Sequence, residues 1–510
     1  MERALPLFVI VPLAVSFLLP LLDKVFRRGG LTRFVAGLTA LALLVLSLHF
    51  LGTPDTVAWI GKWSFSARGA TGISLVSDDL ARLMLVVING IGFAAVLFSL
   101  SYMRRYTSPS LYFTLFFLMM TGMNGVVITG DLFNLFVFLE IAAIASYALV
   151  GFGCESEELE AAFKYLVLGT IGSAFVLLAI GILYNQTGFL NMAQVAQILA
   201  GAPLNRLAVI AAAFFLLGFG LKAAMVPWHA WLPDAHPSAP APISAMLSGV
   251  LIKALGVYAM ARVFFHVIPI RAEFAWAIMT MGALSMVIGV FLAVGQWDFK
   301  RLLAYHSISQ MGYVVLALGV AAEMALRKNY FAAAVAASGG LFHMFNHAAF
   351  KSLLFLCSGA TEYATGTRQL KELGGVKDRL PLTGACLRIA ALSISGVPPM
   401  NGFWSKLMIV IALVLAGHLW LAAMTVLVSF MTLLSFVKVQ RYVLEGDPSA
   451  RVADAIRVPL TMRIAMALLA VVCVGAGVLF PFYGDRLIEA AGNGLVLPAQ
   501  NYIAKVLGGG

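Results

Sequence analysis

Long apolar runs recur along the whole chain, and short polar segments separate them. Each run has about twenty residues, enough for an α-helix to cross roughly 30 Å of hydrocarbon. No polar segment between the runs is long enough for a soluble domain. We count about fourteen runs, with approximate centres at Ala14, Leu43, Gly90, Leu118, Ala142, Phe175, Phe214, Leu255, Ser285, Val315, Phe345, Met400, Val426 and Ala470. The pattern predicts an all-α integral membrane protein, with residues 1–510 forming a single polytopic domain.

Composition supports this class and narrows the chemistry. Apolar residues make up 61% of the chain and charged residues 11%, against roughly 25% charged in a soluble domain. The net charge is +11, but the basic residues are scattered and build no patch, so we expect a lipid bilayer and no nucleic acid as partner. The cysteines lie far apart with no C-x-x-C spacing: Cys154, Cys357, Cys386 and Cys473. We therefore expect no bound cofactor and no metal held by this chain alone.

The distribution of Lys and Arg predicts the orientation in the membrane. Counted from the N-terminus, the odd connections between runs carry the larger share, including Arg104, Arg301 and Arg441. By the positive-inside rule, this excess places both termini outside the cytoplasm, in the inner (plasma) membrane of the cell. The first run, from Ala4 to Leu22, lacks a small-residue cleavage site after it, so we expect it to be a retained helix.

Two of the expected helices are interrupted by proline and carry one lysine each. The segments are Leu221–Pro227, which contains Lys222, and Gly396–Lys406, and they lie five runs apart. A repeat with an odd number of spans must invert in the membrane, and broken helices in matching halves indicate an ion site near mid-membrane. The alternative is two unrelated proline kinks.

Glu140 is the clearest ionisable residue within an apolar run. It lies nine residues, or roughly 13 Å along a helix, beyond Asp131 at the start of its run. A short carboxylate cannot reach water over that distance, and an intramembrane charge is a functional candidate by default. The alternative is a neutral, protonated Glu140 bonded to a backbone carbonyl.

Three lysines are candidates for the same ion path. Lys253 lies near the middle of its run, whereas Lys222 and Lys406 lie beside the proline breaks, where free carbonyls and water can solvate an ammonium. For each of them the alternative is a side chain that extends to the interface. Burial disfavours a charged lysine and an acidic neighbour favours it, so movement of Glu140 relative to a lysine could switch proton transfer.

His343, His347 and Lys351 follow each other at intervals of four and share one helical face. Imidazole accepts and donates protons near neutral pH, so this face could relay protons. Zinc binding is one alternative, although the H-x-x-x-H segment lacks the glutamate of a metalloprotease. The other alternative is that both histidines are structural and form hydrogen bonds within the core.

Lys164 lies just inside its run, after a cluster of glutamates that ends at Glu160. It could support the proton path from within the membrane. It could equally lie at the mouth of the path and pair with the acidic cluster.

Four motifs, in this order, resemble a known family. They are Asp131–Glu140, Phe219–Pro240 with His229, Asp234 and His236, the series His343, His347 and Lys351, and Ser395–Lys406. Together they resemble the antiporter-like membrane subunits shared by respiratory complex I, membrane-bound hydrogenases and Mrp-type sodium/proton antiporters. The similarity extends over essentially the whole chain.

This resemblance implies fourteen helices with two inverted five-helix repeats, over about residues 111–265 and 275–441, and a central row of charges. It implies a proton-transfer role for a set of residues in the row: Glu140 paired with Lys222, Lys253 as the central relay, His343 and His347 as a link, and Lys406 as the terminal group. Lys164, His229, Asp234, His236 and Lys351 would support them. The expected partners are other membrane subunits of a hetero-oligomeric complex and protons, with Na⁺ left open.

Two features of the sequence indicate which branch of this family the chain resembles most. The tail after the last run is short, and Lys406 stands where one complex I branch has a glutamate, so the chain looks most like the D-type subunit of Mrp antiporters and its hydrogenase counterparts. The main alternative is a proton-pumping subunit of a redox-driven complex. An autonomous transporter of an organic solute and a quinone-reducing enzyme are further alternatives, which the row of buried charges and the scattered cysteines disfavour.

Overall fold

A computed structural model describes residues 1–26, 29–62, 72–106, 108–201, 203–484 and 488–508. Within these ranges, eleven helices are long and apolar enough to cross a membrane. The three other predicted spans correspond to α8, α14 and the pair α16 and α17, whose bounds follow. The prediction of an all-α membrane-spanning fold is confirmed.

The chain order of the elements follows the apolar runs. The α-helices and strands are α1 (Leu7–Phe26), α2 (Gly29–Leu51), β1 (Thr56–Trp59), β2 (Ser74–Ser77), α3 (Asp79–Tyr102), α4 (Pro109–Ile128), α5 (Leu132–Val150), α6 (Ser156–Thr187), α7 (Met192–Ala200), α8 (Arg206–Lys222), α9 (Leu232–Ser238), α10 (Ala241–Met246), α11 (Ala259–His266), α12 (Ala272–Val294), α13 (Phe299–Leu326), α14 (Tyr330–Thr365), α15 (Val376–Arg379), α16 (Pro381–Ser395), α17 (Asn401–Leu415), α18 (Leu419–Val439), α19 (Ala450–Ala453), α20 (Leu460–Gly484), α21 (Ala490–Val496) and α22 (Ala499–Leu507). Short 3₁₀ turns are η1 (Ile60–Lys62), η2 (Met103–Arg105), η3 (His229–Trp231) and η6 (Leu370–Glu372), and π-helical segments are η4 (Leu247–Leu251), η5 (Lys253–Tyr258) and η7 (Gln440–Leu444).

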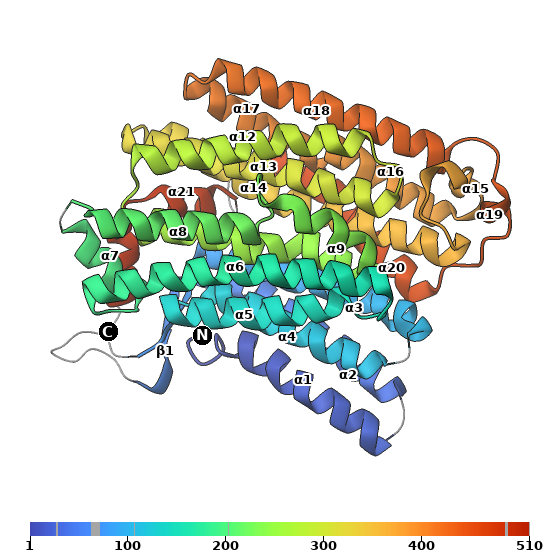
Figure 1. Cartoon of the computed structure of the whole chain (residues 1–510), viewed down its shortest axis with the longest axis horizontal. Coiled ribbons are helices and arrows are strands. Elements are labelled where there is room, and N and C mark those ends of the chain that lie inside the picture. The colour runs from blue at the N-terminus through green and yellow to red at the C-terminus, as the bar shows by residue number, and fades with distance from the viewer. Residues whose placement is uncertain (27–28, 63–71, 107, 202, 485–487, 509–510) are drawn as a thin grey trace.

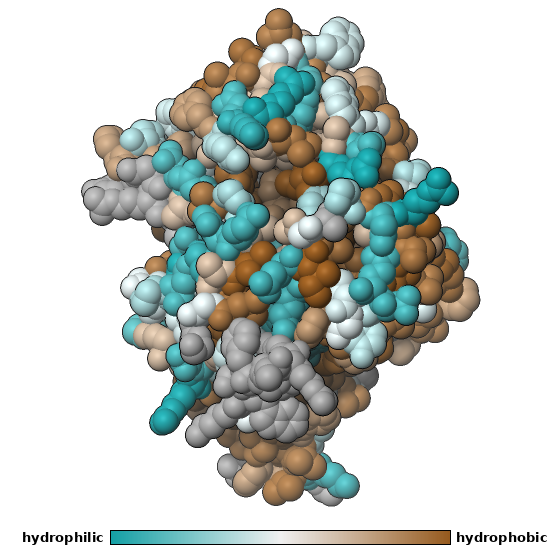
Figure 2. All heavy atoms as spheres, turned by 90° about the vertical axis from the view of Figure 1, so that its left-hand side faces the viewer, coloured by the Kyte–Doolittle hydropathy of each residue, from teal (hydrophilic) through white to brown (hydrophobic). Residues whose placement is uncertain are grey.

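The long helices run roughly parallel and their connections gather at the two ends of the bundle (Figure 1). Helices α17 and α18 form one edge and α1 and α2 the opposite edge. Both chain termini lie at the same end, beside the small antiparallel sheet in which Thr56 pairs with Ser77. We call this end the terminal end, and it carries polar side chains between apolar ones (Figure 2).

Helices α10, α13 and α14 form the interior of the bundle. Every residue in the apolar stretch of the span from Ala241 to His266 is buried, whereas most residues in the apolar stretches of α18 and α20 lie at least partly on the surface. Apolar side chains on such an outer surface face lipid or partner proteins. The interior helices are therefore where polar groups are shielded from lipid.

Both proline-broken helices are present. Helix α8 ends at Lys222 and α9 continues nearly end to end with it after the break (Figure 1). Helix α16 ends at Ser395, and Gly396, with a φ of 75°, turns the chain before α17 begins. Such a positive φ favours glycine, and proline has no N–H to continue the helical hydrogen bonds.

Candidate functional site

Glu140 of α5 and Lys222 at the end of α8 face each other. Lys222 Nζ lies 3.5 Å from Glu140 Oε1, and the Ser173 hydroxyl of α6 donates a hydrogen bond to the same oxygen. The Lys222 side chain is 3% exposed and that of Glu140 is 24% exposed. The pair expected from the sequence is thus brought together, with its carboxylate toward the outside of the bundle.

A cluster of aromatic side chains begins at the lysine of this pair. Lys222 Nζ donates to the Tyr147 hydroxyl over 3.2 Å. Tyr147 packs edge-on against Tyr165, whose ring stacks on Trp231 with 4.1 Å between the centroids. Trp231 Nε1 in turn donates to the Leu221 carbonyl, which also accepts from the Ala224 N–H within the helix break. The segment around the break therefore carries both the lysine and Trp231, which packs on Tyr165 behind Tyr147.

The approach of Tyr147 to Lys222 requires a glycine on α6. A Cβ atom at Gly169 would lie 2.0 Å from the Tyr147 hydroxyl oxygen. Any larger residue at position 169 would displace that hydroxyl.

Lys253 lies where two π-helical segments meet in the span that α10 begins. Its side chain is fully buried, and Nζ donates to the Ser248 carbonyl over 2.6 Å. No carboxylate in the described part of the chain forms an ion pair with it. The lysine is thus held by a backbone oxygen inside an irregular helix, a feature often found at functional sites.

Helix α14 carries the two histidines and the lysine of the predicted relay. His343 bonds Ser405 through Nδ1 at 2.9 Å and Gln310 through Nε2 at 3.2 Å. His347 and Lys351 are completely buried, and none of their side-chain nitrogens bonds a group in the described ranges. The three residues therefore share a helix, but only His343 has hydrogen-bonding partners for its side chain in the described structure.

The geometry does not suit zinc. Both ring nitrogens of His343 are already engaged, and no group of three or more His, Cys, Asp or Glu residues among those described could hold a metal ion.

His236 of α9 joins this group from another helix. Its ring stacks on Phe355 with 4.6 Å between centroids, and Lys351 Nζ lies 5.8 Å from the centroid of the same ring. Both ring nitrogens of His236 are buried without a hydrogen-bonding partner in the described structure. Buried polar atoms almost always bond protein or ordered water, so this part of the row has sites for water to bridge.

Lys406 of α17 reaches back to the break in its own span. Its Nζ donates to the Ile394 carbonyl over 2.7 Å and to Ser429 Oγ over 3.1 Å, and it lies 5.2 Å from the centroid of the Tyr313 ring. A carbonyl freed by the break thus solvates the ammonium, as the sequence predicted.

Lys164 and Asp234 lie at the end of the bundle opposite the terminal end. Lys164 Nζ is 2.8 Å from Glu160 and 3.1 Å from Asp234, and the Lys164 side chain is 48% exposed. Asp234 also pairs with Arg301 at 3.3 Å. These groups border an open cavity of about 300 Å³. Lys164 therefore lies near the end of the bundle and pairs with the acidic cluster, as one of the two alternatives from the sequence had it.

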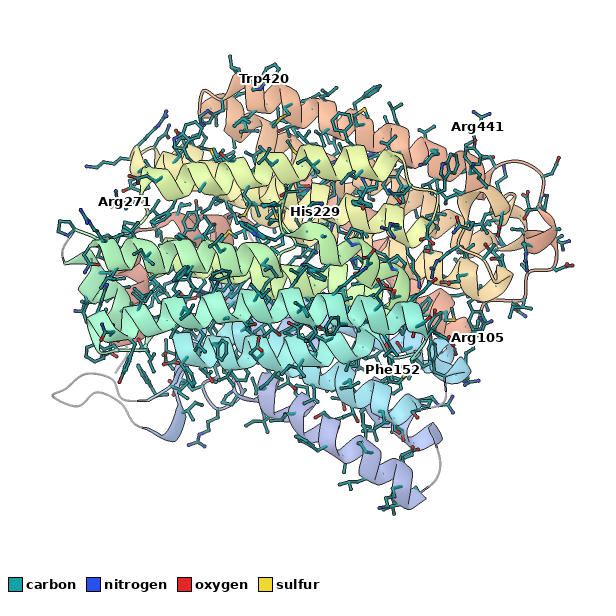
Figure 3. The ribbon with its side chains drawn as sticks, viewed as in Figure 1. Arg105, Phe152, His229, Arg271, Trp420 and Arg441 are labelled. Carbon is teal, nitrogen blue, oxygen red and sulfur yellow. The ribbon has the colours of Figure 1, made fainter. Side chains whose placement is uncertain are left out.

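His229 lies on the turn η3 between α8 and α9, about midway along the bundle (Figure 3). It is partly exposed, and its Nδ1 bonds nothing within the described ranges. It is not in hydrogen-bonding contact with the other residues of the row.

Sequence reasoning missed two buried groups near the row. Lys300 Nζ lies 3.2 Å from Glu362 and also donates to the Ala239 carbonyl. His306 of α13 bonds Ser435 at 2.8 Å and is fully buried. A signal for His306 is present in the sequence, because it lies one helical turn before Gln310 in an apolar run. Lys300 has no such signal, because it stands beside Arg301 at the start of a run, where basic residues are common.

The chain is similar to known proteins over most of its length. Residues 129–432 match the family described as NADH:quinone oxidoreductase/Mrp antiporter, TM, and residues 63–113 match the N-terminus of chain 5 of complex I NADH-ubiquinone oxidoreductase. The chain is 32% identical to the D-type subunit of a Na⁺/H⁺ antiporter of Alkalihalophilus pseudofirmus, covering 86% of this chain and 87% of that protein. It is 35% identical to the N-type subunit of the NADH-quinone oxidoreductase of Desulforudis audaxviator, with 87% of each chain covered. A chain of the Mrp complex from Dietzia sp. has a TM-score of 0.88 at 27% identity and 99% coverage of both chains.

Proposed function

We propose, from the premise that this chain belongs to the NADH:quinone oxidoreductase/Mrp antiporter family of membrane subunits, that it translocates protons within a multisubunit membrane complex. The proposed type is the D-type subunit of an Mrp monovalent cation/proton antiporter. Similarity to a named antiporter subunit of this type and to a chain of an Mrp complex over nearly the full length supports the assignment.

One observation carries the proposal. A series of ionisable side chains begins at the partly exposed Glu140 on the flank of α5 and continues with buried groups on the interior helices and α17. Several of its nitrogens have no partner in the described structure. Such groups are costly in a membrane and mark proton paths. The proposed path consists of Glu140, Lys222, Lys253, His343, His347 and Lys406.

The Glu140–Lys222 pair would act as the switch at one end of the path. An adjacent carboxylate stabilises the ammonium of Lys222, and loss or neutralisation of that carboxylate makes release of the proton easier. Because the Lys222 side chain is 3% exposed and donates to Tyr147, bulk water screens the change only weakly. The state of Glu140 would thereby be transmitted to the interior.

The interior groups would pass the proton on. Lys253 would be the central relay, His347 and His343 the link along α14, and Lys406 the terminal donor or acceptor. Water bridging the unpartnered nitrogens of His347, Lys351 and His236 would complete the connections. The Asp234 carboxylate would attract protons at the mouth, and Lys164 would hold that carboxylate in place.

We also propose the division into two inverted repeats, residues 111–265 and 275–441. The two broken helices support it, because they lie five spans apart and each carries a buried lysine, Lys222 and Lys406.

We further propose other membrane subunits as partners in the inner (plasma) membrane, with both termini on the non-cytoplasmic side. The partial exposure of Glu140 within a span supports a partner that covers this flank. Positions of basic residues support the orientation, because Arg105 and Arg441 lie at the end opposite the termini (Figure 3).

A second candidate is a proton-pumping subunit of a redox-driven complex. The 35% identity to the N-type subunit of a NADH-quinone oxidoreductase favours it, and the same proton path would serve.

The test uses the complex purified through a tag on this chain, with its partners identified by mass spectrometry. In proteoliposomes with an internal pH dye, an imposed Na⁺ gradient should drive proton movement that Glu140→Ala abolishes. Proton movement that requires an electron donor and ignores Na⁺ would establish the redox alternative. Normal Na⁺-driven exchange in Glu140→Ala would overturn the proposed path.

A further inference from the structure

A polar stripe leads from Lys253 to the terminal end of the bundle, away from the α14 histidines. The stripe consists of Ser248, Lys253, Tyr258, Arg262 and His266, each at most 4% exposed. The first three are five residues apart and lie in the π-helical segments, where residues at i and i+5 are aligned. The last three are four residues apart and enter the α-helix α11, where i and i+4 are aligned. The change of helix type keeps all five on one face.

Hydrogen bonds link the outer members of the stripe. Arg262 Nε and Nη2 donate to the Tyr258 hydroxyl over 3.2 and 2.8 Å, and Arg262 Nη1 lies 3.0 Å from His266 Nδ1. The Tyr258 hydroxyl donates to the Val127 carbonyl. These contacts leave no free donor on Tyr258 for a proton to exchange with.

An ion pair closes the stripe. Asp78, which caps α3, accepts from Arg262 Nη1 and Nη2 at 2.5 and 2.8 Å, and both side chains are at most 8% exposed. A guanidinium does not deprotonate in the working pH range, so protons cannot be relayed through Arg262 itself. Water could reach Lys253 along this face only if the pair separates.

The C-terminal segment covers the closed end. Tyr502 of α22 stacks on His266 with 5.0 Å between centroids, and the Gly494 carbonyl of α21 lies 3.3 Å from His266 Nε2. Lys505 forms an ion pair with Asp55. A cavity of about 20 Å³, enough for a single water, lies between these groups and Asp78.

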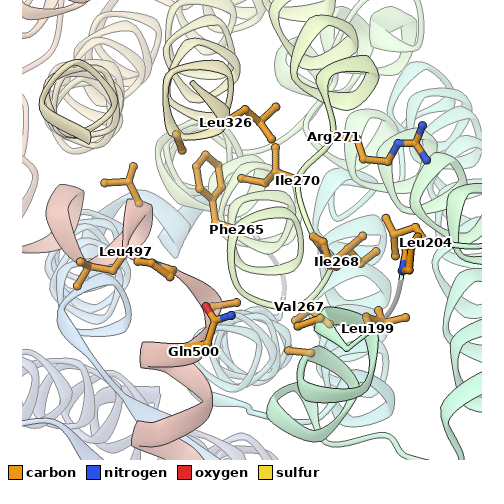
Figure 4. Close-up of a pocket in the computed structure, with 18 of the residues that line it drawn as sticks. Leu199, Leu204, Phe265, Val267, Ile268, Ile270, Arg271, Leu326, Leu497 and Gln500 are labelled. Atoms are coloured by element: carbon orange, nitrogen blue, oxygen red, sulfur yellow. The ribbon is translucent and has the colours of Figure 1, made fainter. Parts of the chain in front are cut away.

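The covering segment has room to move on its other side. Leu497 and Gln500 border a pocket of about 570 Å³ together with Phe265 and Ile268 (Figure 4). The segment is therefore anchored by Tyr502 and Lys505 on one side and packs beside open space on the other.

We propose that this stripe is a proton outlet from Lys253 to the terminal end, separate from the path toward Lys406, and that the Asp78–Arg262 ion pair is its gate. In the open state the Lys253 ammonium gives its proton to water that enters along the stripe, and the neutral amine is then recharged from the central row. The outlet rests on the proposed function, because it needs Lys253 to carry protons.

The test measures passive proton entry into proteoliposomes that contain the intact complex, under a K⁺ diffusion potential and without Na⁺. Asp78→Asn weakens the pair but keeps a hydrogen-bond acceptor, and it should raise the proton leak several-fold. Adding Lys253→Ala to this variant should remove the leak, because the path passes through Lys253. Glu273→Gln, which breaks an exposed ion pair with Arg271 at the same end, is the matched control and should not leak.

A second variant tests the same proposal if the Asp78→Asn protein does not assemble into the complex. Tyr502→Ala leaves the buried pair intact but removes its cover, and it should produce a smaller leak that Lys253→Ala also removes. A wild-type leak rate in every assembled variant would overturn the gate. A leak that persists without Lys253 would overturn the outlet. Failure of the proposed function is read separately, from Na⁺-driven exchange in Glu140→Ala.

Discussion

Lys222 Nζ lies 3.5 Å from Glu140 Oε1, but the lysine is buried while the carboxylate is partly exposed on the flank of the bundle. The two partners therefore face different surroundings: Lys222 is buried beside Tyr147, whereas Glu140 can respond to whatever lies against α5. This asymmetry makes the pair suited to transmit a change from outside the chain to its interior.

Removing either partner of this pair should abolish proton-coupled transport. Lys222→Ala leaves a carboxylate with no counter-charge, and Glu140→Ala leaves a buried ammonium unpaired, which costs about 3–5 kcal/mol. Na⁺-driven proton exchange in proteoliposomes measures the loss. Glu160→Ala, at an exposed pair with Lys164, should retain most of the rate. Normal exchange with either pair variant would remove the pair from the mechanism.

Gly169→Ala should impair transport while leaving the protein folded. The new Cβ would meet the Tyr147 hydroxyl at 2.0 Å and push it away from Lys222. Gly181→Ala on the same helix has no atom within 4 Å of its Cβ, so it should be neutral, with a gain in stability of up to about 1 kcal/mol from helix propensity. Thermal unfolding and proton-exchange rates of the two variants separate the displacement of Tyr147 from the effect of alanine on helix stability. Equal rates would show that the Tyr147 contact is dispensable.

Lys406→Arg should also impair transport. A guanidinium can reproduce the hydrogen bonds of the lysine only in part, and it cannot release a proton in the working pH range. Lys438→Arg is the matched control, because Lys438 donates to the Val294 and Gln296 carbonyls near the helix ends, away from the row. If Lys406→Arg exchanged ions normally, Lys406 would be a fixed charge and not a proton carrier.

A surface cluster predicts one contribution of pH to stability. The hydrogen bond from Lys377, together with the charges of Lys377 and Arg388, lowers the pKa of Glu445 from its ordinary value of 4.5. The carboxylate therefore stabilises the fold above pH 4.5, and this contribution disappears as the pH falls through the lowered pKa. Wild type should unfold at a slightly higher temperature than Glu445→Gln at pH 7. The difference should vanish in strong acid, and a constant difference across this range would contradict the assignment.

The sequence alone determined the spans, the two broken helices and the charges within them. These features depend on local physics: a long apolar run needs a helix to satisfy its backbone in lipid, proline ends that helix, and a charge in such a run stands out against its neighbours. Glu140, Lys222, Lys253 and Lys406 were found for this reason. The Glu140–Lys222 pairing came from a family resemblance, because nothing in the spacing of two residues on different helices states that they meet.

Tertiary structure alone decided which polar groups become partners. Asp78 and Arg262 are far apart in sequence and lie near helix ends, where charges are common, so only packing reveals a buried ion pair. The sequence allowed Lys164 to lie either within the membrane or at the end of the bundle, and its distances to Glu160 and Asp234 place it at the end. The stripe through Lys253 and Tyr258 could not be predicted from the sequence either. Residues five apart lie on different faces of an α-helix, and they share a face only where the chain adopts π-helical turns.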